Sequence, residues 1–322
     1  MRNYSLPVLV ILSLVFYATW SVTAEVFTQP GNFQNIASSQ SILAVLTLGL
    51  LLPMICGNID MSIGPTTGMA SIAAAAAFAD GLPLLLGVAV GIGAGAVVGA
   101  VNAMVVVRLG VDSFIATLGT AALISGLVNW YTKGNSISGI PASVTAFGGG
   151  ITFGIPNLVY VLAVAAAAVW FTLGHTPFGR SLHAVGSNQA SARLVGIRVD
   201  RMTSWAFVLA GALAGLAGVL LLARTGAGNP QIGPGFTLSA IAAAFLGATS
   251  FTLGRINVLG ALTAIFFLAV NITGLQFAGV ATWIGDVFTG LSLVLAVICA
   301  LLLSRSRDPR RRSRGMAASA TS

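Results

Sequence analysis

Charged side chains are scarce in this sequence. Asp, Glu, Lys and Arg together make up 7% of its 322 residues, whereas a soluble domain carries about a quarter. Lysine occurs once, at Lys133, and the phosphate-binding pattern GxxxxGK[ST] is missing. The low charge excludes a second, soluble domain, and the missing pattern excludes ATP binding through such a loop. Because 57% of the residues are hydrophobic, the composition predicts one integral membrane domain.

Cysteines and acidic residues are also few. Cys56 and Cys299 both lie in apolar runs, which excludes a disulfide framework and a thiolate metal site. Five of the acids stand near the ends of apolar runs: Glu25, Asp60, Asp80, Asp112 and Asp286. No carboxylate relay for protons is therefore expected inside the membrane. We expect no catalytic residue, no metal and no cofactor in the chain itself, and a separate subunit that binds ATP.

Runs of apolar residues long enough to cross a bilayer define the fold class. They lie at 6–24, 37–57, 62–79, 83–107, 112–131, 157–174, 202–223, 236–251, 256–278 and 282–304. The sequence therefore predicts an all-α integral membrane protein of about ten transmembrane helices, with one permease-like transmembrane domain over 1–304. The eighth run is short enough to be a re-entrant or interfacial segment instead of a full span.

The distribution of basic residues predicts the orientation. With the N-terminus inside, thirteen of the fifteen basic residues fall in cytoplasmic segments, and only Lys133 and Arg224 fall outside. This bias is what the positive-inside rule expects, so both termini are predicted to be cytoplasmic. The basic tail 305–322 is expected to be disordered. Its arginines follow a last span directly, so orientation and anionic lipid headgroups explain them and no nucleic acid is needed.

One alternative concerns the N-terminus. VTAE, with Val22 and Ala24, resembles a signal-peptidase site after an apolar core. The stretch from Leu6 to Ala24 is long for a signal peptide, and its loss would leave the N-terminus of a nine-helix protein outside. We therefore favour a retained first helix.

A phrase of the sequence occurs twice, 169 residues apart. Residues 63–75 read IGPTTGMASIAAA and residues 232–244 read IGPGFTLSAIAAA, with seven identities. In the same register AVN recurs, at 100–102 and 269–271, and GV recurs at 110–111 and 279–280. The offset leads from the second predicted helix to the seventh, an odd number of crossings, so the copies have opposite orientations. An inverted repeat of helices 2–5 and 7–10 is typical of transporters.

Polar residues near the repeated segments are candidates for a translocation path or gate. They are Asn58, Asp60, Ser62, Asn102 and Asn271. Asp60 precedes the third helix, where it serves as an N-cap, as part of a gate, or as both. An amide within an apolar span must be hydrogen-bonded to another helix or face water, so the two intrahelical asparagines act as interhelical contacts or line a path.

The longest predicted cytoplasmic loop, about 175–201, is where an ATPase would dock. It contains GRSLHAVGSNQASARLVGIRVDRM, which predicts one or two short amphipathic helices broken at Gly186 and Gly196. Between these glycines Asn188 is suited to capping a helix and Ala192 to a close approach. Arg193 is suited to pairing with a carboxylate or carbonyl group of the ATPase, or it simply holds the loop inside.

Three ordered motifs resemble the ribose-type permease subunits of bacterial ATP-binding cassette (ABC) importers. The loop resembles the family pattern GxNxxAARLSGI, with Ser191 and Val195 as departures. GNIDMSIG, from Gly57 to Gly64, is similar to GGIDLSVG, with Asn58 in place of glycine. FTLSAIAAAFLGATS is similar to YELDAIAAVVLGGTS, with Ser239 where the family usually has an acid.

This resemblance, over roughly residues 40–300, implies a permease of the bacterial inner membrane. It implies a cytoplasmic ABC ATPase, a second identical or different permease subunit, and a periplasmic binding protein that delivers a monosaccharide or related polyol. The loop residues Gly186, Asn188, Ala192, Arg193 and Gly196 would then couple the permease to the ATPase. Two alternatives remain, a branched-chain amino acid permease of the same superfamily and a secondary transporter that needs no ATPase.

Overall fold

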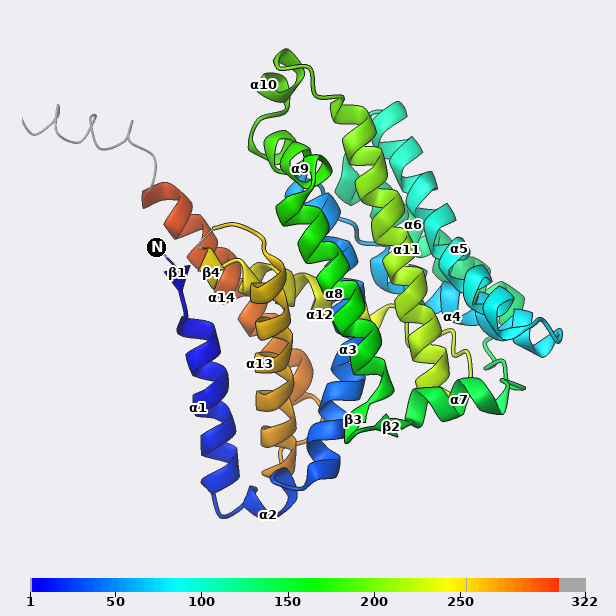
Figure 1. Cartoon of the computed structure of the whole chain (residues 1–322), viewed down its shortest axis with the longest axis vertical. Helices are drawn as coiled ribbons and strands as arrows, with labels where there is room; N and C mark the ends of the chain where they lie inside the picture. Colours follow the sequence, from blue (N-terminus) through cyan, green and yellow to red (C-terminus); the bar gives the residue numbers. More distant parts are fainter. Residues whose placement is uncertain (1, 253, 307–322) are drawn as a thin grey trace, which may run out of the picture.

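The computed structural model describes residues 2–252 and 254–306, which are mostly helical (Figure 1). The helices are α1 (Ser5–Thr19), α2 (Ala24–Phe27), α3 (Pro30–Ile55), α4 (Ile63–Ala79), α5 (Leu84–Ala103), the π-helical turn η1 (Met104–Arg108), α6 (Ser113–Thr132), α7 (Ala142–Gly149), α8 (Asn157–His175), α9 (Pro177–Ser187), α10 (Gln189–Leu194), α11 (Val199–Thr225), α12 (Gly235–Gly247), α13 (Val258–Phe277) and α14 (Ile284–Ser306). The all-α fold class is confirmed.

Each of the ten predicted apolar runs contains one helix, but only some of these helices are long enough to cross a membrane. Within the described residues, six pass on length and composition: α3, α5 with η1, α6, α8, α11 and α13. The shorter apolar helices are α1, α4 and α12, together with α14 when only its part Ile284–Cys299 is counted. α12 has 13 residues, which span about 20 Å at 1.5 Å per residue, against about 30 Å for the hydrocarbon core. The eighth run therefore contains a helix shorter than a full span, as its sequence allowed.

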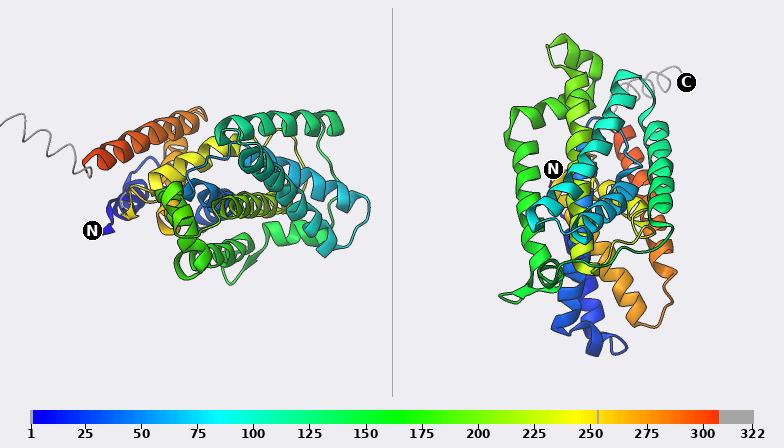
Figure 2. Two further views of the ribbon diagram at one scale, coloured as in Figure 1. Left: turned by 90° about the horizontal axis from the view of Figure 1, so that it is seen from above. Right: turned by 90° about the vertical axis from the view of Figure 1, so that its right-hand side faces the viewer.

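Four two-residue strands complete the described part of the chain. β1 (Arg2–Asn3) pairs with β4 (Phe251–Thr252), and β2 (Ile151–Thr152) pairs with β3 (Ile155–Pro156), both antiparallel. The long helices run between two ends of the molecule, one carrying α9 and α10 and the other carrying α2, α7 and the β2–β3 hairpin (Figure 1). Viewed along these helices, α1 and α14 lie at one short end of an oblong and the α4–α5 connection at the other (Figure 2).

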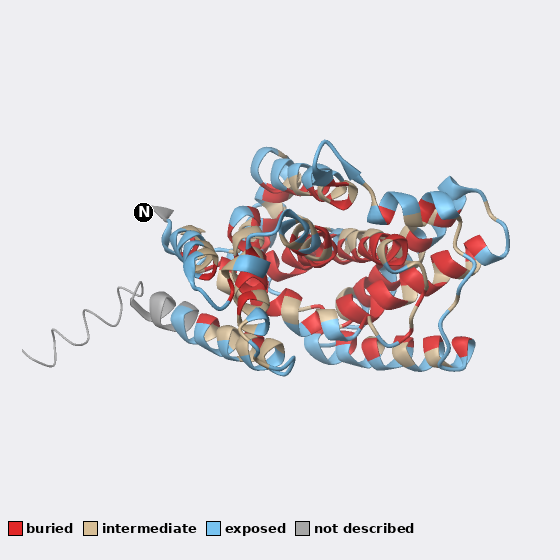
Figure 3. Cartoon of the chain, turned by 90° about the horizontal axis from the view of Figure 1, so that it is seen from below, coloured by how far each residue is buried: buried red, intermediate tan, exposed pale blue. Residues whose placement is uncertain are grey.

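The core centres on α3 and α11, whose side chains are buried along most of their length (Figure 3). Closely approaching glycines make this possible at the crossing of α5 and α11. A Cβ added at Gly95 would lie 2.7 Å from the backbone nitrogen of Gly215, and one at Gly211 would lie 2.9 Å from the nitrogen of Gly99. The two backbones therefore touch, as glycines spaced four residues apart predict for membrane helices.

The first helix is packed into the bundle. The ring of Tyr17 on α1 lies over Gly274 on α13, where an added Cβ would come within 2.6 Å of the ring. Ser13 on α1 is hydrogen-bonded to Asn271 on α13. Cleavage between Ala24 and Glu25 would remove these contacts of α1 with α13.

Candidate functional site

Three of the candidate path residues meet in one buried polar cluster, formed by Asp60, Ser62 and Asn102. The carboxylate Oδ1 of Asp60 accepts hydrogen bonds from the backbone nitrogen of Ser62 at 2.9 Å and from its hydroxyl at 2.6 Å. The Asn102 amide donates to the Ser62 hydroxyl at 2.8 Å and lies 3.5 Å from Asp60 Oδ1. The cluster links α5 to the segment that precedes α4.

The segment 57–62 is also bonded to α6. The backbone nitrogen of Met61 donates to the Thr117 hydroxyl at 2.9 Å, and that of Ile59 donates to the Ser113 hydroxyl at 3.3 Å. Asn58 is half-buried beside them. The connection between α3 and α4 is therefore held by side chains of both α5 and α6, which makes it a rigid part of the fold.

Asp60 is not the N-cap residue of α4. Ser62 occupies that position, without a side-chain cap hydrogen bond, and Asp60 bonds to Ser62 two residues ahead. Asp60 thus fixes the turn that leads into the helix, and its carboxylate is completely surrounded by protein. Gly64 and Pro65 lie in the first turn of α4, as predicted, since proline is tolerated there.

Asn271 lies apart from this cluster, on α13. Its amide nitrogen donates to the Ser13 hydroxyl at 3.1 Å and to the carbonyl oxygen of Phe267 at 2.8 Å. Its side chain turns toward α1, so the two repeat-related asparagines have different partners. Both make hydrogen bonds between helices, which is the first of the two roles that the sequence left open.

The loop after α8 folds into two short helices. The Thr176 hydroxyl accepts from Gly179 at the start of α9, and Asn188 Oδ1 accepts from Ser191 at 2.9 Å at the start of α10, as its predicted capping role requires. Gly196 follows α10 with a φ of +84°, which suits glycine. Gly186 does not bound a helix as predicted, because α9 continues to Ser187 and the break comes at Asn188.

Gly186 instead marks a close contact with α3. A Cβ added there would overlap the carbonyl oxygen of Ile55 in the last turn of α3, so only glycine fits without a shift of backbone. His183 lies one turn earlier, on a cavity of about 460 Å³ that Arg255 also lines. Partial burial, and secondly the positive charge of Arg255, lower the pKa of His183.

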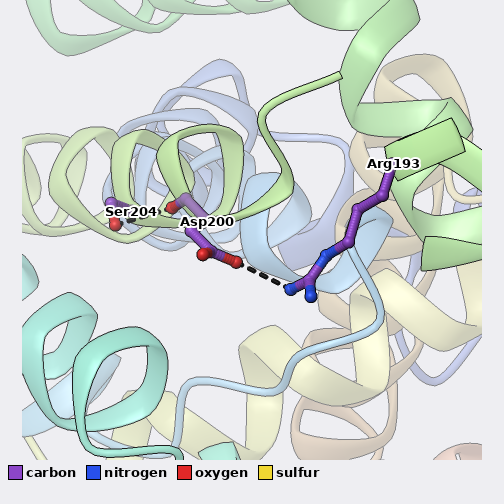
Figure 4. A network of polar contacts seen from close by, with 3 residues as sticks. All are labelled: Arg193, Asp200 and Ser204. Carbon is purple, nitrogen blue, oxygen red and sulfur yellow. Dashed lines mark hydrogen bonds and ion pairs between the residues drawn. The ribbon is translucent and has the colours of Figure 1, made fainter. Parts of the chain in front are cut away.

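The exposed face of α10 carries apolar residues that sequence reasoning did not single out. Leu194 is 88% exposed and Val195 is 76% exposed, whereas Ala192 is buried against its own chain. Arg193 forms an ion pair with Asp200 at 2.8 Å, and the Ser204 hydroxyl donates to the main-chain oxygen of Asp200 (Figure 4). Both charged side chains are largely exposed. The adjacent Leu194 and Val195, which follow the mostly polar segment SNQASAR, were the available signal for this surface.

The fold defines a class, a multi-helix protein with several helices long and apolar enough to cross a membrane and two short helices, α9 and α10, at one end of the bundle. The sequence profile of a family described as "Branched-chain amino acid transport system / permease component" matches residues 32–297. The chain belongs to this permease family.

Several similar proteins are import permeases. The ribose import permease protein RbsC of Escherichia coli is 32% identical over 289 residues, which cover 88% of this chain and 90% of that protein. RbsC of Bacillus subtilis is 32% identical over 280 residues, covering 86% and 87%. The autoinducer 2 import system permease protein LsrC of an Enterobacter species is 36% identical over 260 residues, covering 80% and 76%.

The fold is also similar to a solved structure. This structure is described as an inward-facing conformation of a metal-chelate type ABC transporter, and it matches with a TM-score of 0.51 at 16% identity. The match covers 94% of this chain and 96% of that one. At this identity the likeness shows the fold alone, which is that of an ABC transporter chain.

Proposed function

We propose that the chain is the membrane-spanning permease subunit of an ATP-driven importer of the bacterial inner membrane. It passes a monosaccharide or related polyol, which a periplasmic binding protein delivers, and a separate cytoplasmic ABC ATPase supplies the energy. The ribose and autoinducer 2 permeases among its relatives favour this substrate class over branched-chain amino acids. A second permease subunit, identical or different, completes the membrane part.

The observation that carries the proposal is the apolar tip of the α9–α10 loop. Leu194 and Val195 are exposed at the end of a helix that only six residues form. Outside the membrane, exposed apolar pairs favour a protein contact. The Arg193–Asp200 ion pair beside them is solvent-exposed, and such pairs stabilise a fold by about 0–1 kcal/mol, so Arg193 exchanges Asp200 for an ATPase carboxylate at little cost.

The α9–α10 loop is connected to the buried cluster by a short chain of contacts. Gly186 on α9 lies against the main chain of Ile55, and α3 ends there. The next residues, 57–62, are those bonded to α5 and α6. A displacement of α9 by the ATPase therefore passes through the end of α3 to the start of α4. The buried cluster of Asp60, Ser62 and Asn102 acts in this account as a positioning element of the gate.

Backbone features at an offset of 169 support the inverted repeat. Adding 169 to the bounds of α3, 30–55, gives 199–224, and α11 runs from Val199 to Thr225. Two pairs of glycines at this offset have positive φ, Gly57 with Gly226 and Gly110 with Gly279. Asn229 Oδ1 accepts from the Gln231 nitrogen at 2.9 Å, the same turn that Asp60 forms with Ser62.

The two repeated phrases also contact each other reciprocally. A Cβ on Gly64 would meet the carbonyl oxygen of Gly233 at 2.7 Å and the side chain of Thr237, and a Cβ on Gly233 would meet Gly68 Cα at 2.7 Å. Gly64 and Gly233 are 169 residues apart, and so are Gly68 and Thr237. Such an exchange of partners is the signature of a two-fold axis, which favours an axis of pseudosymmetry between the starts of α4 and α12.

Ten crossings with both termini in the cytoplasm remain the topology that we propose. An even number of crossings brings the ends of the chain to the same side, and the arginine distribution gives that side as the cytoplasm. The basic tail lies outside the described residues from 307 onward. Its arginines are assigned to the cytoplasmic lipid surface and not to nucleic acid.

Assembly with the ATPase tests the proposal. The permease is co-expressed and co-purified with its partner ATPase, and a Leu194→Asp, Val195→Asp variant is compared with wild type. We expect the variant to insert normally and to lose the ATPase, because two carboxylates replace the apolar tip. A Ser204→Ala variant, which alters a hydroxyl on the nearby exposed surface of α11, is the control. Normal ATPase binding and ATP-driven uptake by the double variant would contradict the docking role. Proton-driven uptake without any ATPase would favour a secondary transporter.

A further inference from the structure

A cavity of about 440 Å³, lined by both apolar and polar side chains, lies among α3, α11, α12, α13 and α14. It is separate from the cluster of Asp60, Ser62 and Asn102, none of which lines it. Its polar lining residues relevant here are Gln40, Arg224, Ser239, Thr273, Gln276 and Thr289. Asn271 is adjacent to this lining but turns its side chain toward α1 instead. The cavity has the size of a small-molecule site.

Five of these side chains have unused hydrogen-bonding capacity. Within the described part of the chain no hydrogen bond is formed by the side chains of Gln40, Ser239, Thr273, Gln276 or Thr289. Other hydroxyls on the same helices bond to the carbonyl four residues back, as those of Ser41 and Thr263 do. Thr289 is buried, Gln40, Ser239 and Thr273 are half-buried, and Gln276 is exposed at the rim. Polar side chains that gather in one cavity with donors and acceptors unused are suited to a ligand that makes hydrogen bonds.

The repeat provides an internal comparison. If these polar side chains were needed to build the helices, the other half of the chain would carry similar ones at the same places. The positions 169 residues away are instead occupied by Leu209, Ala70, Met104, Val107 and Thr120. Four of the five are apolar. The polar character therefore belongs to this cavity and not to the architecture that the repeat builds.

The chemistry of the lining selects the kind of ligand. Two carboxamides and three hydroxyls both donate and accept hydrogen bonds, as the hydroxyl groups of a polyol do. The charged lining residue is Arg224, whose guanidinium donates to Asn35 Oδ1 at 2.7 Å. The lining contains no carboxylate to bind an ammonium group. Apolar side chains such as Ile42 and Phe236 complete the wall and suit the C–H face of a sugar ring.

We propose that this cavity is a binding site for an uncharged polyol of monosaccharide size within the permease itself. Gln40, Ser239, Thr273, Gln276 and Thr289 hydrogen-bond its hydroxyl groups. This inference rests on the proposed import of a sugar and adds that the permease binds its substrate directly. Ser239 contributes to it at the position where the resembling family usually has an acid, so the chain makes this contact with a hydroxyl instead.

Direct binding tests the site. Full-length permease in lipid nanodiscs is titrated with D-ribose, with D-gluconate as an acidic analogue and L-leucine as an amino acid, by saturation-transfer NMR. We expect saturable binding of ribose, and a loss of affinity of at least tenfold in the Thr273→Val, Gln276→Leu variant. Thr263→Val is the control, because this hydroxyl lies on the same helix and bonds to Leu259. If the double variant does not fold, Ser239→Ala, on α12, replaces it, with an expected loss of severalfold.

The outcomes separate this site from the proposed function. Absence of ribose binding to wild type, tighter binding of gluconate or leucine, or unchanged binding in the cavity variants overturns the site. ATP-driven sugar uptake by the complete transporter would then still stand. Conversely, ribose binding that the cavity variants abolish, in a transporter without ATP-driven uptake, would retain the site and remove the proposed function.

Discussion

Replacement of Gly186 by alanine perturbs the contact through which we expect the ATPase to move the membrane helices. The added Cβ would overlap the carbonyl oxygen of Ile55, and the next nearest atoms also belong to the backbone of α3. A flexible side chain cannot relieve this overlap, so α9 must shift away from α3. Overpacking of this kind costs about 1–3 kcal/mol. Alanine recovers up to about 1 kcal/mol through its higher helix propensity, so the net effect is a displaced but folded α9.

The expected result is a change in coupling with assembly preserved. The Gly186→Ala permease should co-purify with its ATPase, because Leu194 and Val195 are untouched, but each ATP hydrolysed should drive less uptake. The assay is the ratio of substrate uptake to phosphate release in proteoliposomes. Gly174→Ala on α8 is the matched control, since nothing lies within 4 Å of the Cβ that it adds. A normal ratio in the Gly186→Ala transporter would refute the reasoning.

Three further predictions follow from the same contacts. Asn102→Leu should lower the stability of the detergent-solubilised protein by about 1–3 kcal/mol and Asn271→Leu by about 0.5–1.5 kcal/mol, because Asn102 is fully buried in its polar cluster whereas Asn271 is half-buried. Equal losses would contradict this. The orientation is tested in a background with native thiols changed to serine. Phe153→Cys should react with an impermeant thiol reagent in intact cells, and Leu194→Cys should react only after permeabilisation. The reverse pattern would contradict the proposed orientation in the membrane. The lowered pKa of His183 favours the neutral imidazole in the folded state. Its contribution to folding stability is therefore complete above pH 6.5 and disappears as the pH falls through the lowered value. The loss of thermal stability in acid should be smaller in His183→Gln, and an unchanged pH profile in this variant would exclude the role of His183.

The long helices were predictable because a membrane requires long apolar runs, and their positions follow from where these runs lie in the sequence. The short elements were not predictable. α7 and the β2–β3 hairpin lie in a connection rich in glycine and polar residues, where no periodic pattern distinguishes helix from loop. The length of α12 was also uncertain, because the apolar run extends beyond the point where the helix ends, at Gly247.

The candidate sites could be predicted only in part, because they depend on contacts between residues far apart in the sequence. The sequence indicated Asp60, Ser62 and Asn102 separately, but their association depends on the packing of α5 against the start of α4. Asn188 was predictable as a cap because capping is local. The role of Gly186 was not, because its partner, Ile55, is far away in the sequence. The polar residues of the cavity were equally hidden, since they come from five helices.

Reconstituted transport tests the central claim most directly. The permease is placed in proteoliposomes with its ATPase, ATP on the ATPase side, and a sugar-loaded binding protein on the other side. We predict accumulation of the sugar that requires ATP hydrolysis and the binding protein, persists when a protonophore removes the proton gradient, and is lost in the Leu194→Asp, Val195→Asp variant. Accumulation that depends on the proton gradient and not on ATP, or ATP-driven accumulation of leucine in place of sugar, would contradict the account.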